Sequence, residues 1–419
     1  MLQTVWRRIS LVLVALALVG SGAVVASASA TPPKTTYYAC VTHTNGDLYH
    51  VSTKSNAHCL AKDKTIHWNQ TGPAGAIGAQ GPRGPQGVGG APGPRGATGV
   101  AGANGSPISC ILVTLCTWGA NYSAGTYNFN RPVGVAYDGN HIWVTNYLGN
   151  SVTEINAADG SFVQTIGGGS YNFSSPSAIA FDGTNMWVLN SSTVTEFNAT
   201  TGAFVRNLSG GPYNFSNPVS AVFDGTHMWF ANTANNTVTE VNAADGTFVA
   251  NLSGAAYNFS QPSILAFDGT HVWVVNTPLF QYGSIVELDP SNGNVVRTLT
   301  NATDGLSSPT SVTFDGESLW VADVSNFRVI DPSTGNLQRV VAFPTGIHVS
   351  TVVFDGAHLW TADSSNNTVS KYDIAANSWS PALTSSNYGF NFTEGMAFDG
   401  SHVWAANSFG NSVTEIFSK

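Results

Sequence analysis

One eleven-residue pattern, in which an apolar run ends in Asp-Gly and a second apolar run carries a tryptophan, occurs seven times in the chain. At residues 266–276 it reads AFDGTHVWVVN. The tryptophan always stands five residues after the aspartate, and the copies follow one another every forty to forty-seven residues. The aspartates are Asp138, Asp182, Asp224, Asp268, Asp315, Asp355 and Asp399. The tryptophans are Trp143, Trp187, Trp229, Trp273, Trp320, Trp360 and Trp404. A fixed period in this range, with short β-patterned runs between turns, predicts an all-β, seven-bladed β-propeller with four strands in each blade.

Residues 176–208 show how each blade is expected to fold. Pro176 opens the first strand, and Asp182-Gly183 is expected to form a tight type I′ hairpin turn. The expected second, third and fourth strands are residues 186–190, 193–198 and 203–208. Because one blade cannot bury both of its faces, we expect each tryptophan to fill the gap between neighbouring blades.

The two ends of the repeat array indicate how the ring closes. The last copy stops after its third strand, and the stretch ISCILVTLCTW, residues 108–118, precedes the first copy. We therefore expect residues 108–118 to complete the seventh blade and remove an open sheet edge, so that the propeller spans residues 108–419. Cys110 and Cys116 would lie ~20 Å apart in an extended strand, too far to pair with each other. Buried thiols, bridges to other chains or an unrecognised turn remain open for them.

The N-terminus has the features of an export signal. Arg7 and Arg8 precede an apolar run, and the chain then reaches ASASA at residues 26–30. This predicts a signal peptide over residues 1–30, cleaved after Ala30, and a secreted or cell-surface protein. The alternative is an uncleaved anchor helix, although the apolar run is at the short limit for spanning a bilayer. No later run is long and apolar enough, so we expect no membrane span in the mature chain.

Residues 72–107 repeat glycine at every third position for twelve triplets without a break. Only glycine fits at the axis of three wound polyproline-II chains, so this period predicts a collagen-like stalk. The stretch resembles bacterial collagen-like proteins, which trimerise through such repeats, and a homotrimer is the expected assembly. The alternative is a semi-rigid spacer in a monomer.

A small module, residues 31–71, precedes the stalk and resembles the Cys-bearing head found before collagen starts of the type WNQ-GP-G in secreted bacterial proteins. Asn45-Gly46 between β-prone runs predicts a hairpin. Cys40 and Cys59 are expected to form a disulfide, because an exported chain meets an oxidising environment. A metal site that also uses His43 and His58 is the alternative, but the spacing is not a regular zinc pattern.

The composition argues against nucleic acid as a partner. Only 9% of residues are charged and the net charge is −9, against roughly 25% charged residues in an average soluble protein. The mature chain has no basic cluster of the kind that binds phosphates.

Two sets of polar residues are candidate ligands. Histidine stands two residues before the tryptophan in five copies, as His141, His227, His271, His358 and His402. A repeated position favours a repeated structural role, so we expect these histidines to pack the hairpins rather than to bind metal. The second set lies at the opposite end of the blades, around the mouth of the central channel. There, departures from the repeat place Asp323, His348, Asp363 and Glu394 on blades five to seven, where they are candidates for binding a ligand.

The copies of P-x-x-I-A-F-D-G followed by W-V-x-N-x-x-x-N-x-V resemble bacterial propellers of the NHL, YVTN and streptogramin-lyase group. The resemblance implies, for a lyase, a histidine just after the opening proline, glutamates at the end of the tryptophan strand, and a magnesium ion. The first position instead holds Val133, Ser177, Val219, Ser263, Thr310, Ser350 and Glu394. The second position holds only Asn or Asp. The catalytic pattern is therefore largely absent, and no catalytic residue or cofactor is expected.

Two functions follow as hypotheses. The first is a non-catalytic binding or display protein, whose propellers are held together on a trimeric stalk and contact a protein or carbohydrate ligand. The alternative is a metal-dependent lyase or hydrolase that acts at the channel mouth and holds a divalent cation there with hard oxygen ligands.

Overall fold

The computed structural model of the chain describes residues 36–41, 48–52, 64–69, 118–123, 125–279 and 281–418. The chain divides into two compact units, Met1–Ile111 and Leu112–Lys419. The expected signal peptide, residues 72–107, Cys59, Cys110 and Cys116 lie outside the described residues. The export signal, the collagen-like stalk and the Cys40–Cys59 disulfide therefore stay predictions.

The first unit contains a three-stranded antiparallel sheet in the order β2-β1-β3. Its strands are β1 Thr36–Val41, β2 Leu48–Ser52 and β3 Lys64–Asn69. Because β1 and β2 pair antiparallel on either side of Asn45-Gly46, the predicted hairpin is present.

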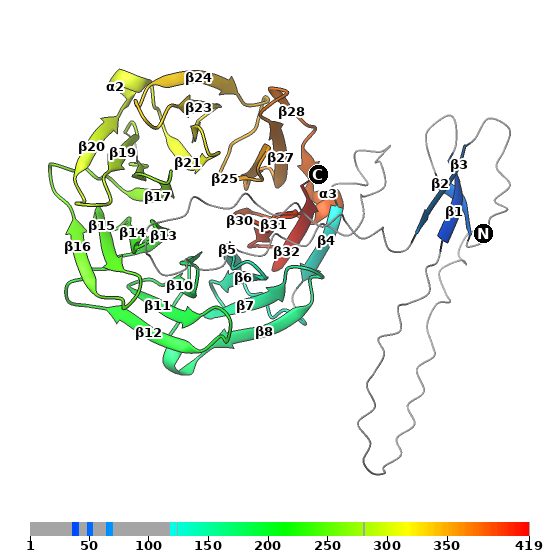
Figure 1. Cartoon of the computed structure of the whole chain (residues 1–419), viewed down its shortest axis with the longest axis horizontal. Helices are drawn as coiled ribbons and strands as arrows, with labels where there is room; N and C mark the ends of the chain where they lie inside the picture. Colours follow the sequence, from blue (N-terminus) through cyan, green and yellow to red (C-terminus); the bar gives the residue numbers. More distant parts are fainter. Residues whose placement is uncertain are drawn as a thin grey trace, which may run out of the picture. The chain divides into compact units, whose positions relative to one another are not determined.

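The second unit is a ring of seven antiparallel sheets, in which the first strand of each blade lies toward the centre and the fourth lies on the rim (Figure 1). Blades 1 to 6 each use strands consecutive in sequence. The fold is an all-β seven-bladed propeller, as the repeat predicts.

The strand bounds follow the repeat closely. Blade 1 has β5 Pro132–Tyr137, β6 His141–Asn146, β7 Ser151–Asn156 and β8 Phe162–Gly167. Blade 2 has β9 Ala178–Phe181, β10 Asn185–Leu189, β11 Thr193–Asn198 and β12 Phe204–Ser209. Blade 3 has β13 Pro218–Phe223, β14 His227–Asn232, β15 Thr237–Asn242 and β16 Phe248–Leu252. Blade 4 has β17 Pro262–Phe267, β18 Val272–Asn276, β19 Ser284–Leu288 and β20 Val295–Leu299.

The remaining blades show the variations. Blade 5 has β21 Pro309–Phe314, β22 Leu319–Asp323, β23 Asn326–Ile330 and β24 Leu337–Ala342. Blade 6 has β25 Thr351–Phe354, β26 His358–Asp363, β27 Thr368–Asp373 and a fourth strand split into β28 Ser378–Trp379 and β29 Leu383–Thr384. Blade 7 has β30 Thr393–Phe398, β31 His402–Asn407, β32 Ser412–Phe417 and β4 Trp118–Ser123. The described helices are short: η1 Gly169–Tyr171, α2 Asn301–Asp304 and α3 Ser385–Tyr388. In the described parts of the chain, no helix has the length and apolarity needed to cross a bilayer.

The Asp-Gly turn differs in type from the prediction. The loop residues are Gly183 and Thr184, because the N–H of Asp182 donates to the carbonyl of Asn185. Only Gly183 has positive φ, 96°, which is the requirement of a type II′ turn, whereas type I′ needs positive φ at both central residues. The expected type I′ turn is therefore wrong, and the aspartate stands just before the loop rather than within it.

That position gives the aspartate its structural role. Asp182 Oδ1 accepts hydrogen bonds from the N–H groups of Thr184 and Asn185, and Oδ2 accepts one from Trp187 Nε1 at 2.7 Å. The indole bond recurs in all seven blades at 2.6–2.8 Å. A buried indole N–H needs such an acceptor, so the five-residue spacing of Asp and Trp follows from one hydrogen bond.

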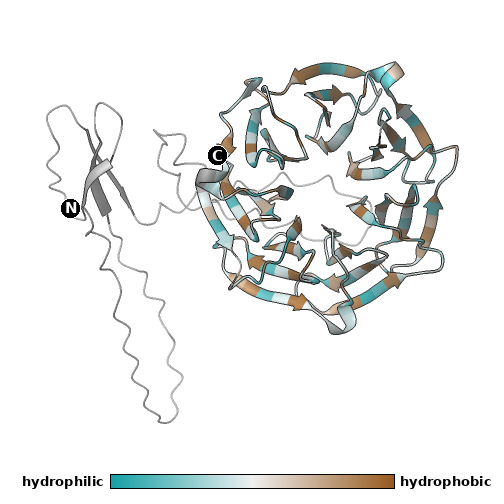
Figure 2. Ribbon diagram, turned by 180° about the vertical axis from the view of Figure 1, so that it is seen from behind, coloured by the Kyte–Doolittle hydropathy of each residue, from teal (hydrophilic) through white to brown (hydrophobic). Residues whose placement is uncertain are grey.

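The tryptophans lie between blades, as predicted. Trp143 of blade 1 packs against Ile179, Met186 and Val188 of blade 2, and all seven tryptophans are fully buried. The hydrophobic core therefore consists of seven clusters, one at each junction between blades. Apolar and polar bands alternate along the rim strands in Figure 2, as expected for outer strands with one buried face.

The N-terminal strand closes the ring, at a register later than expected. The strand that pairs with β32 is Trp118–Ser123 rather than residues 108–118, of which only Trp118 is described. Tyr122 explains the shift, because its ring stacks on Trp404 at 5.5 Å and its hydroxyl donates to Glu415 Oε2 at 2.7 Å. The apolar run before Trp118 has the stronger hydrophobic signal in the sequence, but it contains no tyrosine or other aromatic residue.

Blade 5 offers a matched test of the aspartate's role. Asp315→Ala removes the acceptor of Trp320 Nε1 and of two backbone N–H groups, and we expect a loss of about 2–4 kcal/mol in the free energy of unfolding. Glu317→Ala changes an exposed residue of the same turn, and we expect a change within about 0.5 kcal/mol. Urea denaturation followed by tryptophan fluorescence measures both, and equal stabilities would contradict the assigned role.

Candidate functional site

The mouth face is the end of the ring at which the first strands begin and the second strands end. Each second strand reaches this end with a buried polar residue, in the order Asn146, Asn190, Asn232, Asn276, Asp323, Asp363 and Asn407. Asn146 shows the common arrangement: Oδ1 accepts the N–H of Asn130 at 3.3 Å, and Nδ2 donates to Ser151 and Thr153. The side chain therefore ties the loop before the first strand to the third strand.

Asp323 fills the same structural position in blade 5. Its carboxylate accepts hydrogen bonds from the N–H groups of Ser307 and Ser308 and forms an ion pair with Arg328, at 3.0 Å from Nε. Arg328 occupies the ladder position on β23 that Thr153 occupies on β7. The change from Asn to Asp is thus matched by a change from a hydroxyl to a guanidinium, and Asp323 is engaged within its own blade.

Asp363 is also engaged locally. Its Oδ2 accepts the backbone N–H of His348 at 2.8 Å and the Nδ2 group of Asn366 at 2.8 Å, while Oδ1 accepts the N–H of Asn366. The imidazole of His348 belongs to an exposed residue. Of the four predicted ligand-binding residues, His348 and Asp363 are the pair that the structure joins, through a backbone group.

Glu394 is the third carboxylate of the predicted set and lies at the start of β30. Burial raises its pKa above the usual value, while the charge of Arg131 and a hydrogen bond from Ser408 Oγ, at 3.3 Å, lower it. Among the described residues, no set of three His, Cys, Asp or Glu side chains is arranged to hold a metal ion. The residues present therefore do not fit the magnesium site that the lyase resemblance implies, and the ligand-binding role of Asp323, His348, Asp363 and Glu394 stays a prediction.

The repeated histidines pack the hairpins, as predicted. In all five copies Nδ1 lies 3.0–3.8 Å from the carboxylate of the turn aspartate. Each ring also contacts a carboxylate on the third strand, namely Glu154, Glu240, Glu287, Asp373 or Glu415. In blade 2, which lacks the histidine, Asn185 donates to Glu196 at 2.8 Å instead. Burial raises the pKa of Glu196 and of Glu240 to about 7, against the attraction of Arg206 and His227 respectively.

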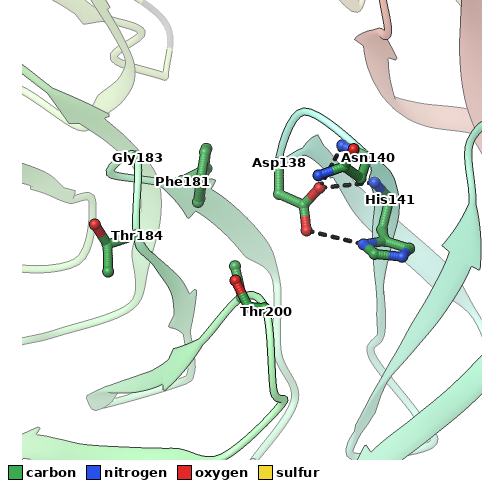
Figure 3. A pocket seen from close by; sticks show the side chains of 8 residues that line it. Asp138, Asn140, His141, Phe181, Gly183, Thr184 and Thr200 are labelled. Atoms are coloured by element: carbon green, nitrogen blue, oxygen red, sulfur yellow. Dashed lines mark hydrogen bonds and ion pairs between the residues drawn. The ribbon is translucent and has the colours of Figure 1, made fainter. Parts of the chain in front are cut away.

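A shallow cleft lies at the Asp-Gly ends of blades 1 and 2. Asp138 and His141 line it from one hairpin, and Phe181 and Thr184 line it from the next (Figure 3). Asp138 and His141 are bonded to each other across 3.3 Å, and Asp138 also holds Trp143. The side chains of Asp138 and His141 are therefore engaged within the hairpin.

Sequence reasoning missed a second group at the mouth. Arg131, Tyr147 and Phe409 lie where blade 7 meets blade 1, and the guanidinium of Arg131 lies over both rings, 4.8 and 5.6 Å from their centroids. The signal was present in the repeat: the residue before the opening proline is Ser175, Asn217 or Gln261 in blades 2 to 4. Blade 1 alone places an arginine or lysine there, whereas blade 6 has His348.

The fold and its mouth define a class, the seven-bladed β-propellers. No protein-family model matches the sequence, and no curated protein is similar to it in sequence. Solved structures do share the fold. Hydrazine synthase from Kuenenia stuttgartiensis has a TM-score of 0.59 at 16% identity, over 70% of this chain and 96% of that chain.

Two lyases have the same architecture. Virginiamycin B lyase from Staphylococcus aureus has a TM-score of 0.55 at 16% identity, over 72% of this chain and 98% of that chain. A streptogramin B lyase has a TM-score of 0.56 at 15% identity, over 72% and 97% of the two chains. The chain is a seven-bladed propeller that resembles the streptogramin B lyase type, and identities this low show the fold alone.

The Asp323–Arg328 pair can be tested by restoring the repeat. Arg328→Thr leaves the buried Asp323 charge without its partner, and Asp323→Asn does the same to the partly buried Arg328. We expect each to cost about 3 kcal/mol. The double variant recreates the Asn–Thr pair of blade 1 and should recover most of that loss. Urea denaturation of the four proteins gives the coupling energy. Strictly additive losses in the free energy of unfolding would show that the two side chains do not interact, and would contradict the pairing of Asp323 with Arg328.

Glu240 makes stability depend on pH. Its raised pKa means that the folded protein holds a proton more tightly than the unfolded chain, so its stabilising effect is present below pH 4.5 and is lost as pH rises toward 7. Glu240→Gln removes that loss. The melting temperature of the variant minus that of wild type should therefore increase from pH 5 to pH 8. Thermal unfolding at both pH values measures this, with the exposed Glu317→Gln as control. A difference that does not change with pH would contradict the assignment.

Proposed function

We propose that the chain is an exported binding protein, in which the propeller is a non-catalytic interaction module at the end of a trimerising collagen-like stalk. The observation that carries this proposal is where exposed apolar side chains lie. On the mouth face they are Leu148, Leu279, Tyr282, Val324 and Phe409. All five stand in the connections between second and third strands. Loops that expose apolar side chains on the same face are typical of a contact surface. The other large exposed apolar residues lie on the outer strands and at the end of β32: Val163, Phe204, Val205, Val249, Val296, Leu337, Val340 and Phe417.

The state of the mouth carboxylates supports binding over catalysis. Asp323 and Asp363 are neutralised or hydrogen-bonded within their own blades. A carboxylate whose oxygens are already engaged in an ion pair or in hydrogen bonds is a poor metal ligand and a poor general base. The metal-dependent lyase alternative rests on the shared fold, which by itself does not carry function.

The stalk would raise the apparent affinity of the proposed binding module. Three propellers joined through residues 72–107 would bind a surface with several contacts at once, and linked sites gain apparent affinity without any new contact. A low charge content, 9%, fits a partner that is recognised by shape and apolar contact. The partner would be a protein or a carbohydrate outside the cell.

The assembly is tested by the solution mass of the mature chain from Thr31, beside a chain that starts at Ser106. We expect multi-angle light scattering to give three chain masses for the first protein and one for the second, because the Gly-X-Y triplets are present only in the first. Monomers in both cases would reduce residues 72–107 to a spacer and contradict multivalent display.

A further inference from the structure

Several departures from the repeat meet on the mouth face where blade 7 adjoins blade 1. They are Arg131 before β5, Phe392 and Glu394 at the start of β30, and Phe409 after β31. The blades pack tightly here, since a Cβ added to Gly395 would stand 2.1 Å from the carbonyl oxygen of Val133. Because a blade folds without these side chains elsewhere in the ring, their convergence at one junction calls for a role beyond the fold.

The backbone fixes two of them in strained positions. Arg131 and Phe392 both have φ of 56°, a left-handed conformation that costs bulky residues of order 1 kcal/mol or more. Each N–H group is held by an asparagine of the preceding blade, Asn411 at 2.7 Å and Asn367 at 2.6 Å. Small polar residues at these two positions would keep the same backbone N–H bonds. The ring therefore does not require the large side chains of Arg131 and Phe392.

The side chains form one continuous set of contacts. The rings of Phe392 and Phe409 stack at 4.5 Å, and the guanidinium of Arg131 lies between Phe409 and Tyr147. Phe409 nevertheless remains 58% exposed, and Leu148 beside Tyr147 is 59% exposed. We call Arg131, Tyr147, Leu148, Phe392, Glu394 and Phe409 the seam site.

The seam site holds opposite charges that do not satisfy each other. Arg131 is near enough to lower the pKa of Glu394, yet no ion pair within 4.0 Å joins them among the described contacts. Arg131 Nε is buried and has no hydrogen-bond partner in the described part of the chain. The buried Nε is itself closed to a ligand, but Arg131 and Glu394 are only partly buried as residues, so the rest of the guanidinium and the carboxylate lie next to exposed apolar surface.

We propose that the seam site binds an extended, uncharged peptide segment of a protein partner. The peptide carbonyl would accept from an Nη group of Arg131, the peptide N–H would donate to Glu394, and an apolar side chain would cover Phe409 and Leu148. Aromatic residues and arginine, with lysine absent, are the composition of energetic centres in protein interfaces. This inference rests on the proposed binding function and names its partner class. An aliphatic Leu148 in the site favours a peptide over a saccharide.

Panning a phage-displayed library of random twelve-residue peptides on the full mature chain tests the site. We expect enriched peptides that carry a large apolar residue without flanking charges. Synthetic copies of them should bind Phe409→Ser and Glu394→Gln at least about tenfold more weakly than wild type, the size expected for a central interface residue. Val249→Ser, which removes a 44% exposed apolar side chain from the outer strand of blade 3, is the control and should keep wild-type affinity. Melting temperatures verify that all the variants fold.

The remaining outcomes separate this inference from the proposed function. Peptides that bind wild type and Phe409→Ser equally would overturn the seam site while leaving a binding module elsewhere on the propeller. Binding to a glycan array that is lost in Phe409→Ser, with no peptide enriched, would replace the peptide by a saccharide and overturn the inference. An absence of both peptide and glycan binding would overturn the inference and the binding function together.

Discussion

A buried tryptophan brings with it a polar N–H that must find an acceptor, and in this propeller an aspartate of the same hairpin provides it. The seven indole bonds, at 2.6–2.8 Å, couple two requirements. The aspartate shapes the turn by accepting two backbone N–H groups, and the same carboxylate makes it possible to bury the largest side chain between blades. Loss of either partner would leave a polar group unsatisfied in the core, which explains why the spacing never varies.

Side-chain contacts of the repeat residues also close the ring. Blade 7 takes its outer strand from the N-terminal side of the array, so the last tryptophan, Trp404, packs against Tyr122 and against the first blade. Asn411 of the last blade holds the N–H of Arg131 in the first blade. The junction of blades 7 and 1 is thus the one place where the repeat is built from two distant parts of the sequence. The repeat also departs from its own pattern here, at Glu394 and Phe409.

The fold could be predicted from the sequence, because each feature of the repeat corresponds to a packing contact or hydrogen bond that every blade makes. The period, the Asp–Trp spacing and the strand positions of blade 2 follow from a pattern that every blade must satisfy. The turn type was missed because Asp-Gly suggests a loop centred on both residues, whereas the carboxylate needs the aspartate outside the loop. The closing strand was placed too early because hydrophobicity outweighed the pairing of Tyr122 with Trp404.

The mouth was harder to predict, for a physical reason. Asp323 departs from the repeat and so was a candidate ligand, but its partner Arg328 lies on the next strand, after a connection whose length differs between blades. A compensating change of this kind is invisible until the strands are paired. Arg131 was missed for the opposite reason, since its contacts with Tyr147 and Phe409 join residues from the two ends of the array.

The dependence of the fold on the Asp–Trp bonds can be measured through indole hydrogen exchange. The chain has eleven tryptophans, of which the seven repeat residues are buried with their N–H groups bonded to aspartate. In a protein labelled with ¹⁵N-tryptophan and transferred to deuterated water, these seven indole signals should persist long after those of the other tryptophans have decayed. Exchange of the repeat indoles at the rate of an unfolded chain would contradict the account, because it would mean that the bonds on which every blade depends are not formed.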